Sequence, residues 1–298
     1  MNLLITGAWS DGKNSISELE TMGHSVCFMQ FEKDDLPCPY EWVEGVICNG
    51  LFLTHSIDRF TNLRYIQLTS AGFDRVDMDY VKEHEIEIHN ARGVYSIPMA
   101  EFALCGVLQL YKQAAFFREN QKRRLWKKHR GLLELSGKQV LIVGCGSVGN
   151  ECAKRFASFG CDITGVDLFP REDNLYSEML PLDDLDNALK QADIVVLTLP
   201  LTGQTCHLID NSKLSLIKDG ATLVNVARGA IIDTRALLNH IDRFTGAVLD
   251  VFEEEPLNEN SPLWDKTNFI LTPHNSFVGD KNGNRLRDIC TSNLKELS

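Results

Sequence analysis

Short apolar runs alternate with amphipathic stretches along almost the whole chain. In the first part, runs at 3–6, 25–30, 46–49, 64–69 and 87–89 have the length and apolar content of strands. A second set follows at 139–143, 162–166, 194–199, 222–226, 247–249 and 269–271. Helical patterns lie between them, for example at 15–22 and at 78–84, where Asp77 is a candidate N-cap. This alternation predicts an α/β protein with parallel sheets covered by helices on both faces.

The two sets of strands predict two doubly wound domains, because 298 residues exceed one ordinary core. We expect residues 1–95 to form the first domain and residues 96–276 the second. The segment 277–298 has helical character and is expected to return toward the first domain. A long helix is expected to start just after Pro98 and to run toward Glu119, since proline is tolerated in a first turn.

A glycine-rich hexapeptide at 144–149 directly follows the strand predicted at 139–143 and opens a helical pattern. Strand, glycine turn and helix are the context in which a Gly-x-Gly-x-x-Gly motif binds a dinucleotide pyrophosphate. The N–H groups of the helix end then meet the phosphates. We expect cofactor contacts from Gly144, Gly146, Ser147, Val148 and Gly149.

Asp167 ends the next predicted strand, where a carboxylate can accept hydrogen bonds from the adenosine ribose hydroxyls. The same carboxylate would repel a 2′-phosphate, so NAD is favoured over NADP as cofactor. Arg171 lies close by in the sequence and could pair with a 2′-phosphate, so NADP remains the alternative.

Two later strands are each followed by a side chain suited to carbonyl chemistry. Arg228 follows the run at 223–227, and its planar fork can bind a carboxylate through paired hydrogen bonds. His274 follows the run at 269–273, and an imidazole can donate a proton to a forming alkoxide. The alternatives are a surface arginine in an ion pair and a structural histidine. Open α/β sheets bind ligands at the carboxyl ends of their strands, which favours catalysis for both residues.

Three adjacent carboxylates precede a proline at Glu253, Glu254, Glu255 and Pro256. A nearby carboxylate would stabilise the imidazolium form of His274 and orient its ring. Glu255 is the first candidate because Pro256 fixes the backbone beside it. Glu253 and Glu254 are rivals, and all three could instead form a solvated acidic turn.

Taken together, these motifs resemble the NAD-dependent D-isomer-specific 2-hydroxyacid dehydrogenases. The resemblance runs from about Arg64 to His274. It includes further strings at 70–77 (Ser-Ala-Gly-Phe-Asp-Arg-Val-Asp), 95–101 (Tyr-Ser-Ile-Pro-Met-Ala-Glu), 198–202 (Thr-Leu-Pro-Leu-Thr), 249–252 (Leu-Asp-Val-Phe) and 261–264 (Ser-Pro-Leu-Trp). It implies a Rossmann dinucleotide-binding domain, a flavodoxin-like substrate domain and an active site in the cleft between them. The implied reaction is hydride transfer between NAD(H) and a small 2-keto or D-2-hydroxy acid.

The resemblance also implies roles for individual residues. Arg228 would bind the substrate, Glu255 would pair with His274, and His274 would act as acid and base. Backbone at Asn49, Gly50, Ala71 and Gly72 would hold the substrate carboxylate. Asp250 would contact the nicotinamide carboxamide. Further cofactor contacts would come from Leu199, Pro200, Thr205, Val226, Ala227 and His274.

The side chain of the substrate stays open at this stage. Leu51 and Phe52 follow the expected carboxylate-binding turn and could form an apolar wall, or they could be core residues. A different class of function is an NAD(H)-sensing binding protein that acts through partner contacts. The presence of Arg228, Glu255 and His274 favours the enzyme.

Composition and charge limit the partners. A net charge of −11 argues against nucleic acid as the main partner, although seven basic residues and Trp126 lie between Arg118 and Arg130. The resemblance places a dimerisation arm there, so we expect a homodimer through 98–130. No signal peptide or apolar stretch long enough to cross a bilayer is apparent. Nine irregularly spaced cysteines favour reduced thiols in the cytoplasm, and we expect no membrane partner and no metal site.

Overall fold

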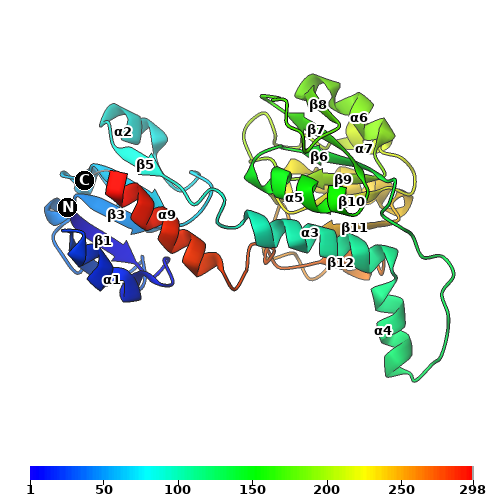
Figure 1. Cartoon of the computed structure of the whole chain (residues 1–298), viewed down its shortest axis with the longest axis horizontal. Coiled ribbons are helices and arrows are strands. Elements are labelled where there is room, and N and C mark those ends of the chain that lie inside the picture. The colour runs from blue at the N-terminus through cyan, green and yellow to red at the C-terminus, as the bar shows by residue number, and fades with distance from the viewer. Residues whose placement is uncertain (297–298) are drawn as a thin grey trace. The chain divides into compact units, whose positions relative to one another are not determined.

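A computed structural model describes residues 1–296 and contains two parallel β-sheets, one in each of two compact units (Figure 1). One unit comprises residues 1–95 together with the C-terminal segment from Gly279 onward. The other unit comprises Ser96–Val278. Among residues 1–296, no helix is both long and apolar enough to span a membrane. The predicted α/β class with two parallel sheets is confirmed.

The first unit contains a five-stranded sheet of order β2-β1-β3-β4-β5, the flavodoxin-like strand order. All neighbouring strands are parallel. Every residue of β3 and β4 is buried, as expected for strands covered on both faces. The strands are β1 (Asn2–Thr6), β2 (Ser25–Met29), β3 (Gly45–Cys48), β4 (Tyr65–Leu68) and β5 (Glu87–His89).

Three helices cover this sheet: α1 (Gly12–Thr21), α2 (Met78–Glu83) and α9 (Asn282–Glu296). The predicted N-cap of α2 is confirmed, because the Asp77 carboxylate accepts hydrogen bonds from the N–H groups of Asp79 and Tyr80. This cap satisfies two of the donors that the first helical turn leaves without a partner.

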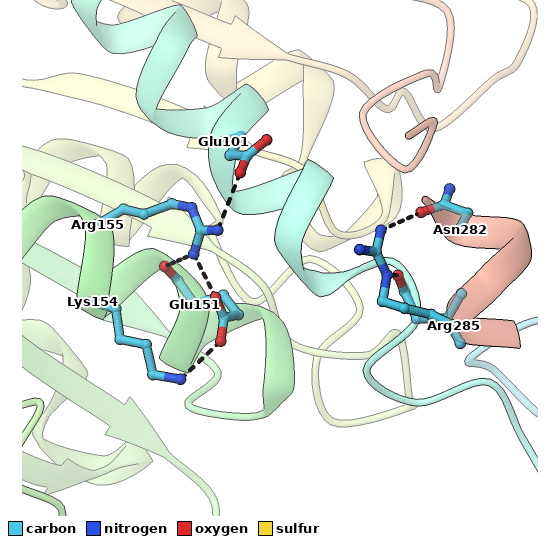
Figure 2. A network of polar contacts seen from close by, with 7 residues as sticks. Glu101, Glu151, Lys154, Arg155, Asn282 and Arg285 are labelled. Carbon is cyan, nitrogen blue, oxygen red and sulfur yellow. Dashed lines mark hydrogen bonds and ion pairs between the residues drawn. The ribbon is translucent and has the colours of Figure 1, made fainter. Parts of the chain in front are cut away.

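The last helix, α9, lies beside α1 within the first unit (Figure 1). Its apolar face contributes Leu286, Cys290 and Leu294 to the core cluster that contains Leu3 and Ile5 of β1. Close to its start, Arg285 donates from Nε to the Val94 carbonyl at 2.7 Å and from Nη2 to Asn282 Oδ1 at 2.8 Å (Figure 2). Apolar burial and these hydrogen bonds fix the C-terminal segment on the N-terminal sheet.

The second unit contains a seven-stranded sheet of order β12-β11-β10-β9-β6-β7-β8, which is the dinucleotide-binding order with one added edge strand. The strands are β6 (Gln139–Val143), β7 (Asp162–Asp167), β8 (Glu178–Pro181), β9 (Ile194–Leu197), β10 (Thr222–Asn225), β11 (Gly246–Leu249) and β12 (Phe269–Leu271). The sequence pattern missed β8, a short edge strand that ends in Pro181. Proline cannot donate to a sheet, so it demotes such a run in any sequence-based assignment.

The helices of the second unit are α3 (Ser96–Tyr111), α4 (Ala114–Lys122), α5 (Ser147–Ser158), α6 (Leu185–Gln191), α7 (Asn211–Leu216) and α8 (Thr234–His240). The prediction of one helix from Pro98 to Glu119 is wrong, because α3 begins at Ser96 and ends at Tyr111. Gln113 then adopts a left-handed conformation with φ of 54°. A left-handed residue ends the helical hydrogen-bond ladder, so α4 starts in a new direction.

Helices α3 and α5 pack together and are linked by charged side chains (Figure 2). Arg155 of α5 donates from Nη2 to Glu101 Oε1 of α3 at 3.2 Å and also pairs with Glu151 one turn earlier. Lys154 donates to the same Glu151 at 2.8 Å. These pairs fix α5, whose N-terminus follows the glycine turn.

Candidate active site

The glycine turn between β6 and α5 is compact enough to exclude side chains at two of its positions. Gly144 has φ of 99°, and a Cβ there would lie 2.5 Å from the Leu199 backbone nitrogen. A Cβ on Gly149 would lie 2.2 Å from the Gly144 carbonyl oxygen. Thr198 donates from Oγ1 to that same oxygen at 2.6 Å, which joins the turn to the end of β9. These contacts explain why both positions are glycine.

The turn also offers free donors. Within residues 1–296, the N–H groups of Gly146, Ser147 and Val148 have no hydrogen-bond acceptor in the protein. A Cβ on Gly146 would meet no protein atom within 4 Å, so this position faces open space. Free N–H groups at a helix N-terminus beside open space fit a pyrophosphate. The residues present therefore fit a dinucleotide cofactor.

Alanine substitutions at the two glycines on either side of Cys145 are expected to have different effects on stability and on NADH binding. Gly144→Ala is expected to lower the melting temperature and to weaken NADH binding, because the new methyl group meets backbone in a left-handed conformation. Gly146→Ala is expected to leave the melting temperature near that of the wild type and to weaken NADH binding about tenfold, because its methyl group enters only the cofactor's approach. Thermal melts and NADH fluorescence titrations measure the two effects. Equal melting temperatures for the two variants would contradict this account of the turn.

Asp167 lies at the carboxyl end of β7, beside the glycine turn. Its Oδ2 accepts a hydrogen bond from the Cys145 N–H at 2.7 Å, and its Oδ1 accepts one from the Phe169 N–H at 3.0 Å. The carboxylate is partly exposed, so lone pairs remain for ribose hydroxyls. Burial raises the pKa of the Cys145 thiol to about 12, so this side chain in the glycine turn stays protonated and inert.

Thr205, Val226 and Ala227 were also predicted to contact the cofactor, but their side chains are buried. Thr205 is fully buried, and its hydroxyl donates to the Pro200 carbonyl at 2.6 Å and accepts from the Thr202 N–H. Thr205 therefore shapes the loop after β9 from within. The side chains of Val226 and Ala227 lie in the core, which leaves their backbone as the part that can face a ligand.

Arg228 follows β10 in a loop that the sequence analysis did not explain. The buried side chain of Asn225 accepts a hydrogen bond from the Ala227 N–H and donates to the Arg228 carbonyl, both at 3.0 Å. Arg228 donates from Nη1 to the Ala227 carbonyl at 2.8 Å and forms no salt bridge within residues 1–296. Asn225 was missed as a positioning residue, although an asparagine that folds back on the next two or three residues is a known turn pattern.

Gly229 allows this loop to lie against the segment after β11. A Cβ on Gly229 would lie only 1.8 Å from the Phe252 carbonyl carbon. Backbone cannot move aside as a flexible side chain can, so any larger residue would displace Arg228 or the segment that leads to Glu255.

His274 follows β12 and contacts one of the three candidate glutamates. Its Nδ1 lies 2.9 Å from Glu255 Oε2, while Glu255 Oε1 accepts a hydrogen bond from the Phe252 N–H at 3.0 Å. Glu253 instead pairs with His207 and accepts from the Thr234 N–H at 2.8 Å. Burial alone would raise the pKa of Glu253, but hydrogen bonds from Thr234 and His207 hold it below the usual range. Glu254 is exposed.

Asp250 lies just after β11, and its side chain is fully buried. Its Oδ1 accepts hydrogen bonds from the Thr272 hydroxyl at 2.7 Å and the Asn275 N–H at 2.8 Å, and its Oδ2 accepts one from the Ser276 N–H at 2.8 Å. Its carbonyl accepts from the N–H of His274, whose φ is 51°. The structure thus places Asp250 as the anchor of the loop that carries His274.

Asp250→Asn is expected to destabilise the protein by about 2 kcal/mol or more, because the new amide NH₂ would face an N–H donor and lose a charge-assisted hydrogen bond. The loop at 272–276 would then lose its fixed conformation, and kcat is expected to fall with it. Chemical denaturation measures the first effect and steady-state kinetics the second. Wild-type stability with reduced activity would contradict the anchoring role and favour direct contact with the cofactor.

The four predicted substrate-binding residues of the first unit lie at the carboxyl ends of β3 and β4, but only two of them have free N–H groups. The N–H groups of Asn49 and Gly50 both donate to Glu32 at 2.7 Å. Those of Ala71 and Gly72 have no acceptor within the described chain.

Leu51 and Phe52, which could have formed either a substrate wall or part of the core, belong to the core. Leu51 is fully buried, and Phe52 packs edge-on against the Phe60 ring in the same core cluster. Leu53 is instead 70% exposed.

The predicted catalytic side chains follow three adjacent parallel strands: Arg228 follows β10, Asp250 and Glu255 follow β11, and His274 follows β12. The model of the D-isomer specific 2-hydroxyacid dehydrogenase NAD binding domain matches residues 104–276. The chain belongs to this family. Its cofactor is NAD(H), in agreement with the free donors of the glycine turn. Within residues 1–296, no cluster of three or more His, Cys, Asp or Glu side chains could hold a metal ion.

Individual members of the family cover most of the chain. A glyoxylate reductase of Thermofilum pendens is 34% identical over 247 residues, which span 80% of this chain and 73% of the relative. An (S)-sulfolactate dehydrogenase of Chromohalobacter salexigens is 34% identical over 242 residues, 80% of this chain and 78% of that one. A crystal structure of a family protein from Aeromonas salmonicida superimposes with a TM-score of 0.86 at 29% identity and covers 99% of this chain and 95% of that one.

Proposed function

We propose that this protein is an NAD-dependent D-2-hydroxyacid dehydrogenase that reduces a small 2-keto acid to the D-2-hydroxy acid. The observation that carries the proposal is the 2.9 Å contact between His274 and Glu255, two strands away from an arginine without an ionic partner in residues 1–296. A fixed cation and an oriented imidazole are the groups that reduction of a carbonyl beside a carboxylate requires.

Arg228 would bind the substrate in this proposal. Its guanidinium can form paired hydrogen bonds with the carboxylate and polarise the neighbouring carbonyl oxygen. Asn225 holds the backbone on both sides of Ala227, so the base of the arginine side chain is fixed before substrate binds. In the first unit, the free N–H groups of Ala71 and Gly72 are the proposed donors to a substrate carboxylate.

His274 would hold the proton that the carbonyl oxygen receives. Glu255 engages Nδ1, which leaves Nε2 as the nitrogen that donates to the forming alkoxide. In the opposite direction the same nitrogen would accept the hydroxyl proton. Bound NADH supplies the hydride, and the protein supplies orientation and charge.

An assay of NADH oxidation tests this proposal with glyoxylate, pyruvate, hydroxypyruvate, 2-ketoisocaproate and phenylpyruvate as substrates. We expect turnover well above background with at least one of them. If NADH binds but none of these acids is reduced, the protein is better described as an NAD(H)-sensing binding protein that acts through partners.

We further propose a cytoplasmic homodimer. Trp126 is wholly exposed and Leu125 is 47% exposed in the segment after α4. Such an indole is costly to leave in water and would serve as a buried anchor against a second copy.

The nine cysteine thiols, all free in the structure, favour a reducing compartment. Sedimentation equilibrium tests the assembly, and a monomer at micromolar concentration would contradict it.

A further inference from the structure

Glu32 holds a position that the proposed function does not explain. It follows β2, and its carboxylate accepts three hydrogen bonds from the carboxyl ends of two neighbouring strands. Oε1 accepts from the hydroxyl of Thr6, the last residue of β1, and from the Asn49 N–H after β3, and Oε2 accepts from the Gly50 N–H, all at 2.7 Å. Two successive N–H groups that point at one carboxylate form an anion-binding nest. The chain therefore fills an anion site with its own side chain.

The neighbouring strand end shows the contrast. After β4, the Ala71 and Gly72 N–H groups have no acceptor within residues 1–296. Their surroundings are fixed by other bonds, since Asn90 donates to the Ala71 carbonyl at 2.7 Å and Ser70 donates to the Gly72 carbonyl at 3.1 Å. The same sheet edge thus presents one open pair of donors and one closed pair.

Among residues 1–296, no cationic side chain forms an ion pair with the Glu32 carboxylate that closes the second pair. Arg75 lies near the nest, with its Cδ 3.9 Å from the place of a Cβ on Gly50, but its guanidinium makes no ion pair with Glu32. A fixed negative charge therefore remains at this edge of the sheet.

We propose that Glu32 is a selectivity residue that restricts the substrate to monoanionic 2-keto acids with an uncharged side chain. This inference rests on the proposed function, because it concerns the substrate of the same site. Within the first unit, the keto acid's own carboxylate would accept hydrogen bonds from the open pair at Ala71 and Gly72. A second anionic group on the substrate would find the Asn49 and Gly50 donors occupied and a carboxylate in its path.

The negative charge of Glu32 and its three hydrogen bonds both disfavour the binding of a second anionic group. A second anion within a few ångströms of a carboxylate is repelled, since like charges at that distance disfavour each other strongly outside bulk water. Displacing Glu32 would also break three charge-assisted hydrogen bonds, each stronger than a neutral one. Discrimination therefore comes from an unfavourable contact with the wrong substrate.

The test compares oxaloacetate with 2-ketovalerate, which has a similar length and no second charge. In wild type the ratio of kcat/KM for oxaloacetate to that for 2-ketovalerate is expected to be about one hundredth or less. Glu32→Gln keeps the size and removes the charge, and it should raise this ratio about tenfold or more. Glu32→Ala, which also opens the nest beside Arg75, should raise it further. An unchanged ratio in both variants would overturn the proposal.

Thr6→Val is the matched control, because it removes one hydrogen bond to Glu32 and leaves the charge in place. The ratio of kcat/KM for oxaloacetate to that for 2-ketovalerate should stay within about twofold of the wild-type ratio in this variant. A rise as large as that of Glu32→Gln would show that local packing, not charge, sets the preference, and would contradict the proposal.

Amide resonances give a readout that needs no turnover. In wild type saturated with NADH, oxamate, a pyruvate analogue that is not reduced, should shift the Gly72 amide and leave the Gly50 amide unchanged. In Glu32→Ala, malonate, which carries two carboxylates as oxaloacetate does, should shift the Gly50 amide. A Gly50 shift in wild type would overturn the occupancy of the nest. Absence of all 2-keto acid reduction by wild type would instead count against the proposed function.

Discussion

His274→Ala is expected to lower kcat about a hundredfold or more while the dissociation constant for NADH stays close to the wild-type value. The variant removes the proton donor, and the glycine turn that is expected to hold the cofactor's pyrophosphate follows β6, a different strand. Single-turnover kinetics measure the first quantity and fluorescence titration the second. Equal losses in NADH affinity and kcat would contradict the proposed role of His274.

A neighbouring pair of glutamates supplies the control for this prediction. Glu255→Gln removes the carboxylate that contacts His274, so kcat should fall, though less than in His274→Ala. Glu253→Gln disturbs the contact with His207 and leaves the 2.9 Å contact between Glu255 and His274 intact. Its kcat should stay near that of wild type. A larger loss for Glu253→Gln than for Glu255→Gln would show that the wrong glutamate has been assigned.

Arg228→Ala is expected to lower kcat/KM for the preferred 2-keto acid about a hundredfold or more, because a charged, bidentate contact with the substrate carboxylate is lost. Stability should change little, since the side chain's only hydrogen bond within the described residues goes to the adjacent Ala227 carbonyl. Steady-state kinetics and thermal melts measure the two effects.

Two further variants make the test specific. Arg228→Lys retains the charge but not the planar fork, so it should recover only part of the lost activity. Arg235→Ala removes an exposed arginine of α8 and should leave kcat/KM near the wild-type value. Full activity in Arg228→Lys would show that a point charge suffices and would contradict the bidentate contact.

Much of the fold is visible in the sequence because it depends on local periodicity. Buried parallel strands require continuous apolar runs, and nearly every such run became a strand. The glycine turn is visible through its spacing, and Gly149 is required by the Gly144 carbonyl within the turn, whereas Gly144 is also required by the Leu199 backbone just after β9. The break after Tyr111 and the strand β8 were missed because a left-handed glutamine and a proline-ending strand have weak sequence patterns.

The candidate site was less predictable where it depends on hydrogen bonds between distant residues. Asn225 ends a strand and looks like an ordinary polar residue in the sequence, and Asp250 was expected from the resemblance to contact the nicotinamide carboxamide, not to anchor a loop. Asp250 anchors the loop that carries His274 because folding brings the backbone of Asn275 and Ser276 to it from the next strand, whereas the bonds of Asn225 to Ala227 and Arg228 are local. Buried polar groups are almost always hydrogen-bonded, but the sequence does not say to what.

The sequence by itself determined that this is a two-sheet α/β protein of the 2-hydroxyacid dehydrogenase family with a dinucleotide turn, an arginine and a histidine at strand ends. The two sheets and the dinucleotide turn follow from periodicity and glycine spacing, and the family follows from the resemblance of the ordered motifs. Only the tertiary structure decided that Glu255 contacts His274 while Glu253 contacts His207, and that Glu32 closes the donors of Asn49 and Gly50. Such choices depend on which groups folding brings within hydrogen-bond distance, because that distance is short and the partners are far apart in sequence.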